Sequence, residues 1–279
     1  MSETKDYSIE DFRKSGDELF RKLHTATHPI AVKYIKSLDE VPDGVKRPIE
    51  KGLKMSICQA FTQSRRFSEQ WCITAEDNFC IPSIIDHGWI HLSIEEYVEM
   101  QKKQDWYSNP DSLERFIKNQ YTKNIKDLMD LGYIGVISAP LNETTFIPDC
   151  VLIYGNGKQM TYMIQSLGFE RKKEFQMNIT FGDYGESCKK ALRAFLNNRP
   201  EIIIPGNCER AICLIQDEEV AMALPAKAAF YVAEYLFSTG RKQGLKMPLR
   251  QVAPRLTEEV NPGYVYAKEI IDKTKNKGN

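Results

Sequence analysis

Apolar and polar residues alternate with changing periods along the chain, and each period indicates a helix or a strand. Residues 8–23 carry apolar side chains at helical spacing behind Ser8, a typical helix N-cap. Residues 30–35 follow Pro29 and alternate as a strand does. The same criteria predict further helices over residues 56–66, 93–103, 109–131, 160–167, 186–198, 218–224 and 226–237. They predict further strands over residues 71–74, 133–138, 150–154, 175–181, 202–204 and 211–215.

This alternation predicts an α/β or α+β fold in which helices flank a mixed sheet. The chain of 279 residues is long enough for a single large domain with a substantial core. We expect residues 1–240 to form that α/β domain, with its core assembled from both halves of the chain. Residues 241–279 are rich in Pro and Lys and are expected to form a partly frayed C-terminal extension.

Net charge and hydropathy indicate which kinds of partner are not expected for the protein. The 38 basic and 38 acidic side chains give a formal net charge of zero, so binding to nucleic acid is not expected. The most apolar stretch, residues 220–237, is interrupted by Pro225, Lys227 and Glu234, so no membrane span is expected. The polar N-terminus lacks the features of a secretory signal, and this predicts a cytoplasmic protein.

The seven cysteines carry the clearest candidate chemistry. Their odd number and the lack of a secretory signal argue against a disulfide framework. No two of them form a Cys-x-x-Cys pair, so the local signature of a zinc ribbon is absent. A metal site in this chain must therefore be assembled by the fold from distant segments, and ordinary free thiols are the alternative.

Sequence context divides the cysteines into two groups. Three lie in apolar, strand-like runs, where cysteine behaves as a small buried hydrophobe: Cys72, Cys150 and Cys213. Four lie at helix starts or in loops, where thiolates can be exposed and meet at a shared ion: Cys58, Cys80, Cys188 and Cys208. Spacing alone leaves both a metal site and ordinary free thiols open for the second group.

Six segments between His28 and Phe237 carry a family resemblance. They are MSICQA at 55–60, TAEDNFC at 74–80, IPDCVLIYGN at 147–156, GESC at 185–188, IPGNCER at 204–210 and DEEV at 217–220. With these segments in this order, the chain resembles the family called domain of unknown function 169, found mostly in anaerobic bacteria and archaea. One departure is the Gly155-Asn156-Gly157 run, where the family often has Gly-Asn-Pro.

The resemblance implies a ligand set, because the cysteine pattern of the family matches Cys58, Cys80, Cys188 and Cys208. Four cysteines suit a tetrahedral zinc ion or a 4Fe–4S cluster. The anaerobic setting implied by the family favours the 4Fe–4S cluster, with zinc or no cofactor as the alternatives.

We therefore expect a cytoplasmic, cysteine-ligated iron–sulfur or other metal protein that acts with a small-molecule substrate or a redox partner. One version of this expectation is an enzyme of anaerobic metabolism, in which Arg65 and Arg210 orient a small anionic substrate or tune the cluster. Structural salt bridges explain both arginines equally well. The catalytic residues are not identified, and formation of a homo-oligomer is left open.

Two other classes of function remain as alternatives. One is a metal-free small-molecule binding or regulatory domain, with its ligand above the glycine turn at residues 155–158, where a helix start can meet a phosphate. The other is a thiol enzyme that uses Cys58 or Cys80 alone.

Overall fold

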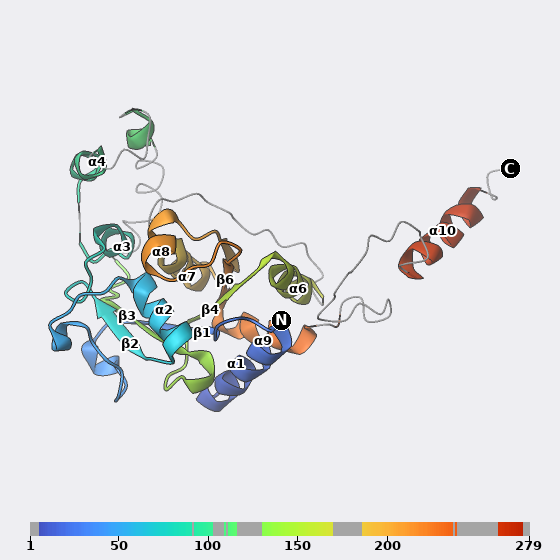
Figure 1. Ribbon diagram of the computed structural model, residues 1–279, viewed down its shortest axis with the longest axis horizontal. Helices are drawn as coiled ribbons and strands as arrows, with labels where there is room; N and C mark the ends of the chain where they lie inside the picture. The colour runs from blue at the N-terminus through green and yellow to red at the C-terminus, as the bar shows by residue number, and fades with distance from the viewer. Residues whose placement is uncertain are drawn as a thin grey trace.

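In the part of the chain that the structure describes, six strands form one central sheet (Figure 1). The computed structural model describes residues 6–90, 92–102, 109, 111–115, 130–169, 186–236, 238 and 262–275. The strands are β1 (Ile30–Ile35), β2 (Trp71–Thr74), β3 (Gly135–Pro140), β4 (Cys150–Gly155), β5 (Glu201–Ile203) and β6 (Val220–Pro225). They lie in the order β2-β3-β1-β4-β6-β5, and each neighbouring pair is antiparallel.

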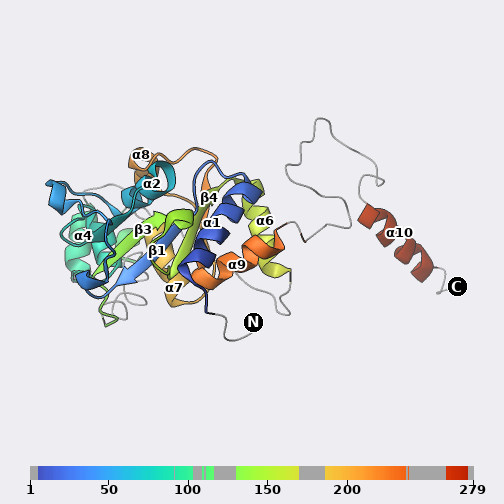
Figure 2. The same cartoon turned by 90° about the horizontal axis from the view of Figure 1, so that it is seen from below.

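Helices cover both faces of this sheet (Figures 1 and 2). One face packs against α1 (Ile9–Leu23), α6 (Gly157–Gly168) and α9 (Ala226–Tyr235). The other face packs against α2 (Ile57–Phe67) and α7 (Glu186–Leu196). The short helix α3 (Ile81–Asp86) contacts α7, and α8 (Asn207–Ile212) contacts α2. The remaining described elements are α4 (Ile94–Lys102), α10 (Pro262–Lys275) and the 3-10 turns Leu38–Glu40, Ile49–Lys51 and Leu141–Glu143.

Burial on both faces explains why the strands are apolar with little interruption. Successive side chains of a strand point to opposite faces of its sheet. Along β1, Ala31 and Ile35 therefore join the core on the α1 side, whereas Ile30 and Val32 join the core on the α2 side. The two cores pack helices against both faces of the sheet. This packing fixes the positions of the starts of α2 and α7.

The structure confirms the α/β class and most of the expected elements. The strands at 30–35 and 71–74 have the expected bounds, and the ends of α1, α2 and α7 lie within two residues of those expected. Ser8 caps α1 as predicted, since its Oγ accepts the Asp11 N–H at 3.2 Å. A mixed sheet was expected, whereas the paired strands described here are antiparallel; an isolated bridge between Lys46 and Trp71 is parallel.

Two expected elements are wrong, and both fall between residues 207 and 225. The strand predicted at 211–215 is the end of α8 and an irregular turn, because the helix already begins at Asn207 behind Gly206. The helix predicted at 218–224 is strand β6. Its pairing with β4 on one side and β5 on the other outweighs the helix propensity of its alanines and Met222.

Some expectations fall outside the described residues. They are the strand at 175–181, most of the helix at 109–131 and much of the C-terminal extension. The division of the chain near residue 240 therefore stays a prediction. None of the helices within the described ranges combines the length and the apolar character needed to cross a bilayer.

Candidate functional site

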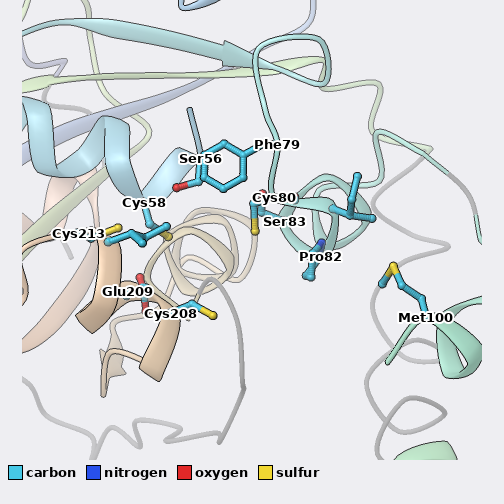
Figure 3. Close-up of a pocket in the computed structure, with 12 residues that line it drawn as sticks. Ser56, Cys58, Phe79, Cys80, Pro82, Ser83, Met100, Cys208, Glu209 and Cys213 are labelled. Atoms are coloured by element: carbon cyan, nitrogen blue, oxygen red, sulfur yellow. Dashed lines mark hydrogen bonds between the residues drawn. The ribbon is translucent and has the colours of Figure 1, made fainter. Parts of the chain in front are cut away.

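A cavity of about 380 Å³ lies where the starts of α2, α3 and α8 approach one another (Figure 3). Its volume falls at the lower end of the range of about 300–1,000 Å³ that is typical of small-molecule and cofactor sites. Four cysteines line it, namely Cys58, Cys80, Cys208 and Cys213, and apolar side chains make up most of the rest. Figure 3 shows these four residues around one space, with Met100 at the end away from Cys213.

Each cysteine of the predicted ligand set lies at the start of a helix. Cys58 and Cys208 are the second residues of α2 and α8, Cys188 is the third residue of α7, and Cys80 is the N-cap of α3. Ser56 begins α2 as its N-cap, because its Oγ accepts the Gln59 N–H at 3.2 Å. Helix starts from four separate segments therefore carry the thiols to one region.

Cys188 does not line the cavity but contacts a residue that does. Its side chain is fully buried and lies beside Cys58. Interaction with the Cys188 thiol, together with burial, raises the pKa of Cys58 well above its ordinary value. Burial also raises the pKa of Cys80 to about 11. Without a bound cation, Cys58 and Cys80 are therefore neutral thiols near pH 7.

The structure thus brings three cysteines of the predicted ligand set, Cys58, Cys80 and Cys208, to the wall of one cavity, whereas Cys188 is buried behind that wall, beside Cys58. Cys72 and Cys150 are fully buried in the sheet, as their apolar context indicated. Cys213 is buried too, at 2% exposure, but it also lines the cavity. Because Cys213 lies in an apolar run, the sequence analysis did not identify it as a residue that lines the cavity.

The arrangement of the thiols restricts which metal ion or cluster they could bind. Within the described part of the chain, no group of three or more Cys, His, Asp or Glu side chains is arranged to hold a metal ion directly. The thiols border a shared cavity instead. As donors they fit the expected group, because soft thiolates are the ligands that zinc and iron–sulfur clusters select.

Glu209 is a further lining residue, which the sequence analysis missed. Its two carboxyl oxygens accept the backbone N–H groups of Ser187 and Gly206, each at 3.1 Å. Ser187 precedes Cys188, and Gly206 lies two residues before Cys208. Glu209 therefore ties two cysteine-bearing helices together. A Glu three residues after the N-cap of a helix, here Gly206, is a capping pattern that could have revealed this role.

We expect Glu209→Gln to lower the free energy of unfolding by about 1–3 kcal/mol, because one amide oxygen cannot replace two carboxyl oxygens and leaves a buried N–H unpaired. Urea denaturation measures the effect. The exposed Glu218 provides the matched control, since Glu218→Gln should change the free energy by less than about 0.5 kcal/mol. Equal effects of the two substitutions would contradict the tie between the helices.

Asn78 and Ser83 fix the position of Cys80. The Oδ1 of Asn78 accepts the Cys80 N–H at 2.8 Å, and its Nδ2 donates to the Oγ of Ser83 at 2.7 Å. The Ser83 Oγ in turn donates to the Cys80 carbonyl oxygen at 2.9 Å. These bonds close the turn that leads into α3 and hold Cys80 at the edge of the cavity.

Arg65 lies in a buried ion pair and not on the wall of the cavity. Its guanidinium donates to the two oxygens of Glu219 at 2.8 and 3.2 Å, and its centre lies 4.2 Å from the ring centroid of Tyr154. It also donates to the carbonyl oxygen of Leu214 at 3.1 Å. Arg65 therefore holds the segment that follows α8, next to Cys213.

Arg210 also donates to acceptors within the protein. Its Nη1 donates to the carbonyl oxygen of Gln216 at 3.0 Å, and this bond fastens α8 to the loop that leads into β6. Arg210 does not line the cavity as described. Both arginines therefore position the walls of the site, and a direct role for either in binding an anion stays a prediction.

The glycine turn at residues 155–158, the alternative ligand site, is satisfied by side chains of the protein. The backbone N–H of Asn156 donates to the Gln159 Oε1 at 2.8 Å, and the Gln159 N–H donates to the Asn156 Oδ1 at 3.1 Å. The Gln159 Nε2 also donates to the carbonyl oxygens of Leu23 and His24. Gln159 therefore connects this turn, at the start of α6, to the C-terminal end of α1.

The fold and the site define a class of protein: an α/β protein whose antiparallel sheet supports a cysteine-lined cavity at several helix starts. The profile of domain of unknown function 169, described as Uncharacterised ArCR, matches residues 18–234. The chain belongs to this family, which confirms the resemblance seen in its sequence.

One relative comes from Methanocaldococcus jannaschii and is named Uncharacterized protein MJ0308. It is 21% identical to this chain over 224 residues, which cover 78% of this chain and 90% of the relative. No solved structure matches the chain significantly.

Proposed function

We propose that this protein is a cytoplasmic metal protein that binds a 4Fe–4S cluster, or failing that zinc, through Cys58, Cys80, Cys188 and Cys208. The observation that carries the proposal is the convergence of these thiols: three line one cavity and the fourth contacts Cys58. The residues come from four helix starts that are distant in sequence. Cysteines that serve only as small buried hydrophobes do not require such an arrangement. Cys72 and Cys150 are cysteines of this type, and they are buried within the sheet.

The helices around the site favour a negatively charged centre. Cys58 and Cys188 lie in the first turns of α2 and α7, which are eleven residues long each. The positive end of a helix dipole stabilises a nearby negative charge by about 0.3–1 kcal/mol. Four thiolates carry more negative charge than one Zn²⁺ ion neutralises. The helix starts thus offset part of the cost of burying such a centre.

The volume of the cavity favours a cluster over a single ion. The thiols border about 380 Å³ of space, whereas one water molecule occupies about 30 Å³ in the liquid. A four-iron cluster can therefore reach sulfurs on several walls of the cavity, whereas zinc would require the side chains to converge further. Thiolate ligands suit either group.

Four protein ligands leave no open position on the metal, so electron transfer or a structural role is favoured over Lewis-acid chemistry. A bound 4Fe–4S cluster would supply one-electron chemistry. The residues of the chain would hold the cluster, keep it in an apolar surrounding and orient the thiolates. A redox partner is the interaction that this role requires.

We expect metal affinity to rise with pH. Because the pKa values of Cys58 and Cys80 are raised, both thiols must release a proton when they bind metal. Mass action then increases the affinity by about tenfold per pH unit for each proton released, up to the thiol pKa. Competition with a zinc chelator between pH 6 and 9, corrected for protonation of the chelator, measures the slope. An affinity independent of pH would contradict thiol ligation.

The direct test is purification without oxygen, followed by measurement of iron, acid-labile sulfide and zinc per chain. We expect iron and sulfide in equal amounts, near four of each per chain, as the composition of a 4Fe–4S cluster requires. Stoichiometric zinc without sulfide would support the zinc form instead. A preparation with neither metal would defeat the proposal.

A further inference from the structure

We propose that the cysteine cavity binds a small, neutral, largely apolar molecule at its end near Pro82 and Met100. The inference deepens the proposed function, because it takes the metal centre as the group beside which this molecule lies. It departs from the anionic substrate that the sequence suggested.

The shape of the site provides the first argument. Figure 3 places Cys58 and Cys213 at one end of the cavity and Pro82 and Met100 toward the other. The second end is therefore bordered in part by apolar side chains and lies away from Cys58 and Cys213, the two most buried cysteines of the lining. A ligand that occupies it would lie beside the metal centre without displacing a cysteine.

Exposure of apolar side chains at the cavity provides the second argument. Phe79, Ile81 and Ile212 line the cavity and are 46%, 40% and 45% exposed. Large apolar side chains that gather at a concave site and remain accessible to water are typical of ligand-binding positions. Covering them with an apolar molecule removes their surface from water, which favours binding.

Charge provides the third argument. Among the described residues that line the cavity, none is Lys, Arg or His, and Glu209 carries a carboxyl group. The guanidinium of Arg65 is held by Glu219, and that of Arg210 by backbone carbonyl oxygens. Once the metal centre is bound, an anion entering the cavity would meet Glu209 and the coordinated thiolates, whose negative charge the helix starts already offset in part, and no Lys, Arg or His of the described lining would balance it. Like charges placed together in this way repel each other, so a neutral ligand is favoured.

The polar groups of the lining are already engaged with the protein. The Ser56 Oγ accepts the Gln59 N–H, and the Ser83 Oγ donates to the Cys80 carbonyl oxygen. Recognition of a ligand therefore depends on apolar contacts with Phe79, Ile81 and their neighbours more than on hydrogen bonds. The chemical class of ligand that fits is a neutral aromatic or aliphatic molecule.

Two fluorescent probes with the same ring system test the inference: neutral N-phenyl-1-naphthylamine and anionic 8-anilinonaphthalene-1-sulfonate. The full-length, anaerobically purified protein is titrated with each. We expect saturable binding of the neutral probe and roughly tenfold weaker binding of the anionic probe. Phe79→Ser should weaken binding of the neutral probe roughly tenfold. Phe67→Ser, which removes a similarly exposed ring that does not line the cavity, should leave it unchanged.

Equal or tighter binding of the anionic probe would overturn the inference, and so would equal effects of Phe79→Ser and Phe67→Ser. Iron, sulfide and zinc are measured on the same samples, so the two proposals fail separately. Binding of the neutral probe that depends on Phe79 in a metal-free protein would support the ligand site and defeat the metal centre. Full metal content without such binding would support the metal centre and defeat the ligand site.

Discussion

Replacing Cys58 by serine is expected to remove the metal centre from the protein, and the same holds for Cys80, Cys188 and Cys208. A serine hydroxyl is a harder and much less acidic donor than a thiol, and a thiolate is what zinc and iron–sulfur clusters select. The loss of affinity should exceed the roughly 10- to 100-fold that removal of an outer-shell partner costs. Metal and sulfide per folded chain, measured after anaerobic purification, report the effect.

The other cysteines provide matched controls for this series. Cys72→Ser and Cys150→Ser place a hydroxyl in the buried sheet and should lower stability while leaving metal per folded chain unchanged. Cys213→Ser distinguishes a set of four ligands from a set of five, because Cys213 also lines the cavity. If one of the four proposed ligands were replaced without loss of metal, that residue would not be a ligand.

Arg65→Met should cause the largest loss of stability among the substitutions considered, about 3–5 kcal/mol, because it removes the closer and fully buried of the two arginines that pair with the buried Glu219. The Arg65 side chain has no exposed surface, and that of Glu219 is 7% exposed. Urea denaturation measures the effect. The neighbouring Arg66 provides the control: it lies 3.5 Å from Glu219 and is 22% exposed, so Arg66→Met should cost less than about 1 kcal/mol.

The ion pair between Arg65 and Glu219 is also expected to make the free energy of unfolding depend on pH. Burial raises the pKa of Glu219, but hydrogen bonds from Arg65 and the Gln216 N–H lower it by more, so the net pKa lies below the ordinary value. The pair therefore stabilises the fold above about pH 4.3, the ordinary pKa of an unfolded Glu, and this stabilisation is lost as pH falls through the folded pKa. The difference between wild type and Arg65→Met should be largest near pH 7 and shrink below about pH 4. A difference independent of pH would contradict this role.

Local sequence context was enough to separate Cys72 and Cys150, which lie in the sheet, from Cys58, Cys80 and Cys208, which line the cavity. Cys150 lies in a run of apolar residues, which indicated burial on both faces of a sheet. Cys58 lies two residues after Ser56, a residue typical of helix N-caps, and this indicated a thiol at a helix start. Both expectations depend on short-range chemistry that the sequence displays directly.

The expectations that were wrong depend on contacts between distant segments. The residues of β6 have the composition of a helix, and only their pairing with β4 and β5 makes them a strand. Cys213 was assigned to a strand, yet it lies after α8 and lines the cavity, because Thr62 and Arg65 of α2 donate to its carbonyl oxygen. The sequence alone does not reveal such long-range bonds, so the walls of the cavity could not be predicted from it.

The X-ray absorption spectrum of the anaerobically purified protein, recorded at the K-edge of its metal, tests the central claim most directly. The account predicts a first coordination shell of sulfur alone, with neighbouring iron atoms visible for a cluster, or four sulfurs at about 2.3 Å for zinc. A shell dominated by nitrogen and oxygen, or a protein without metal, would contradict it.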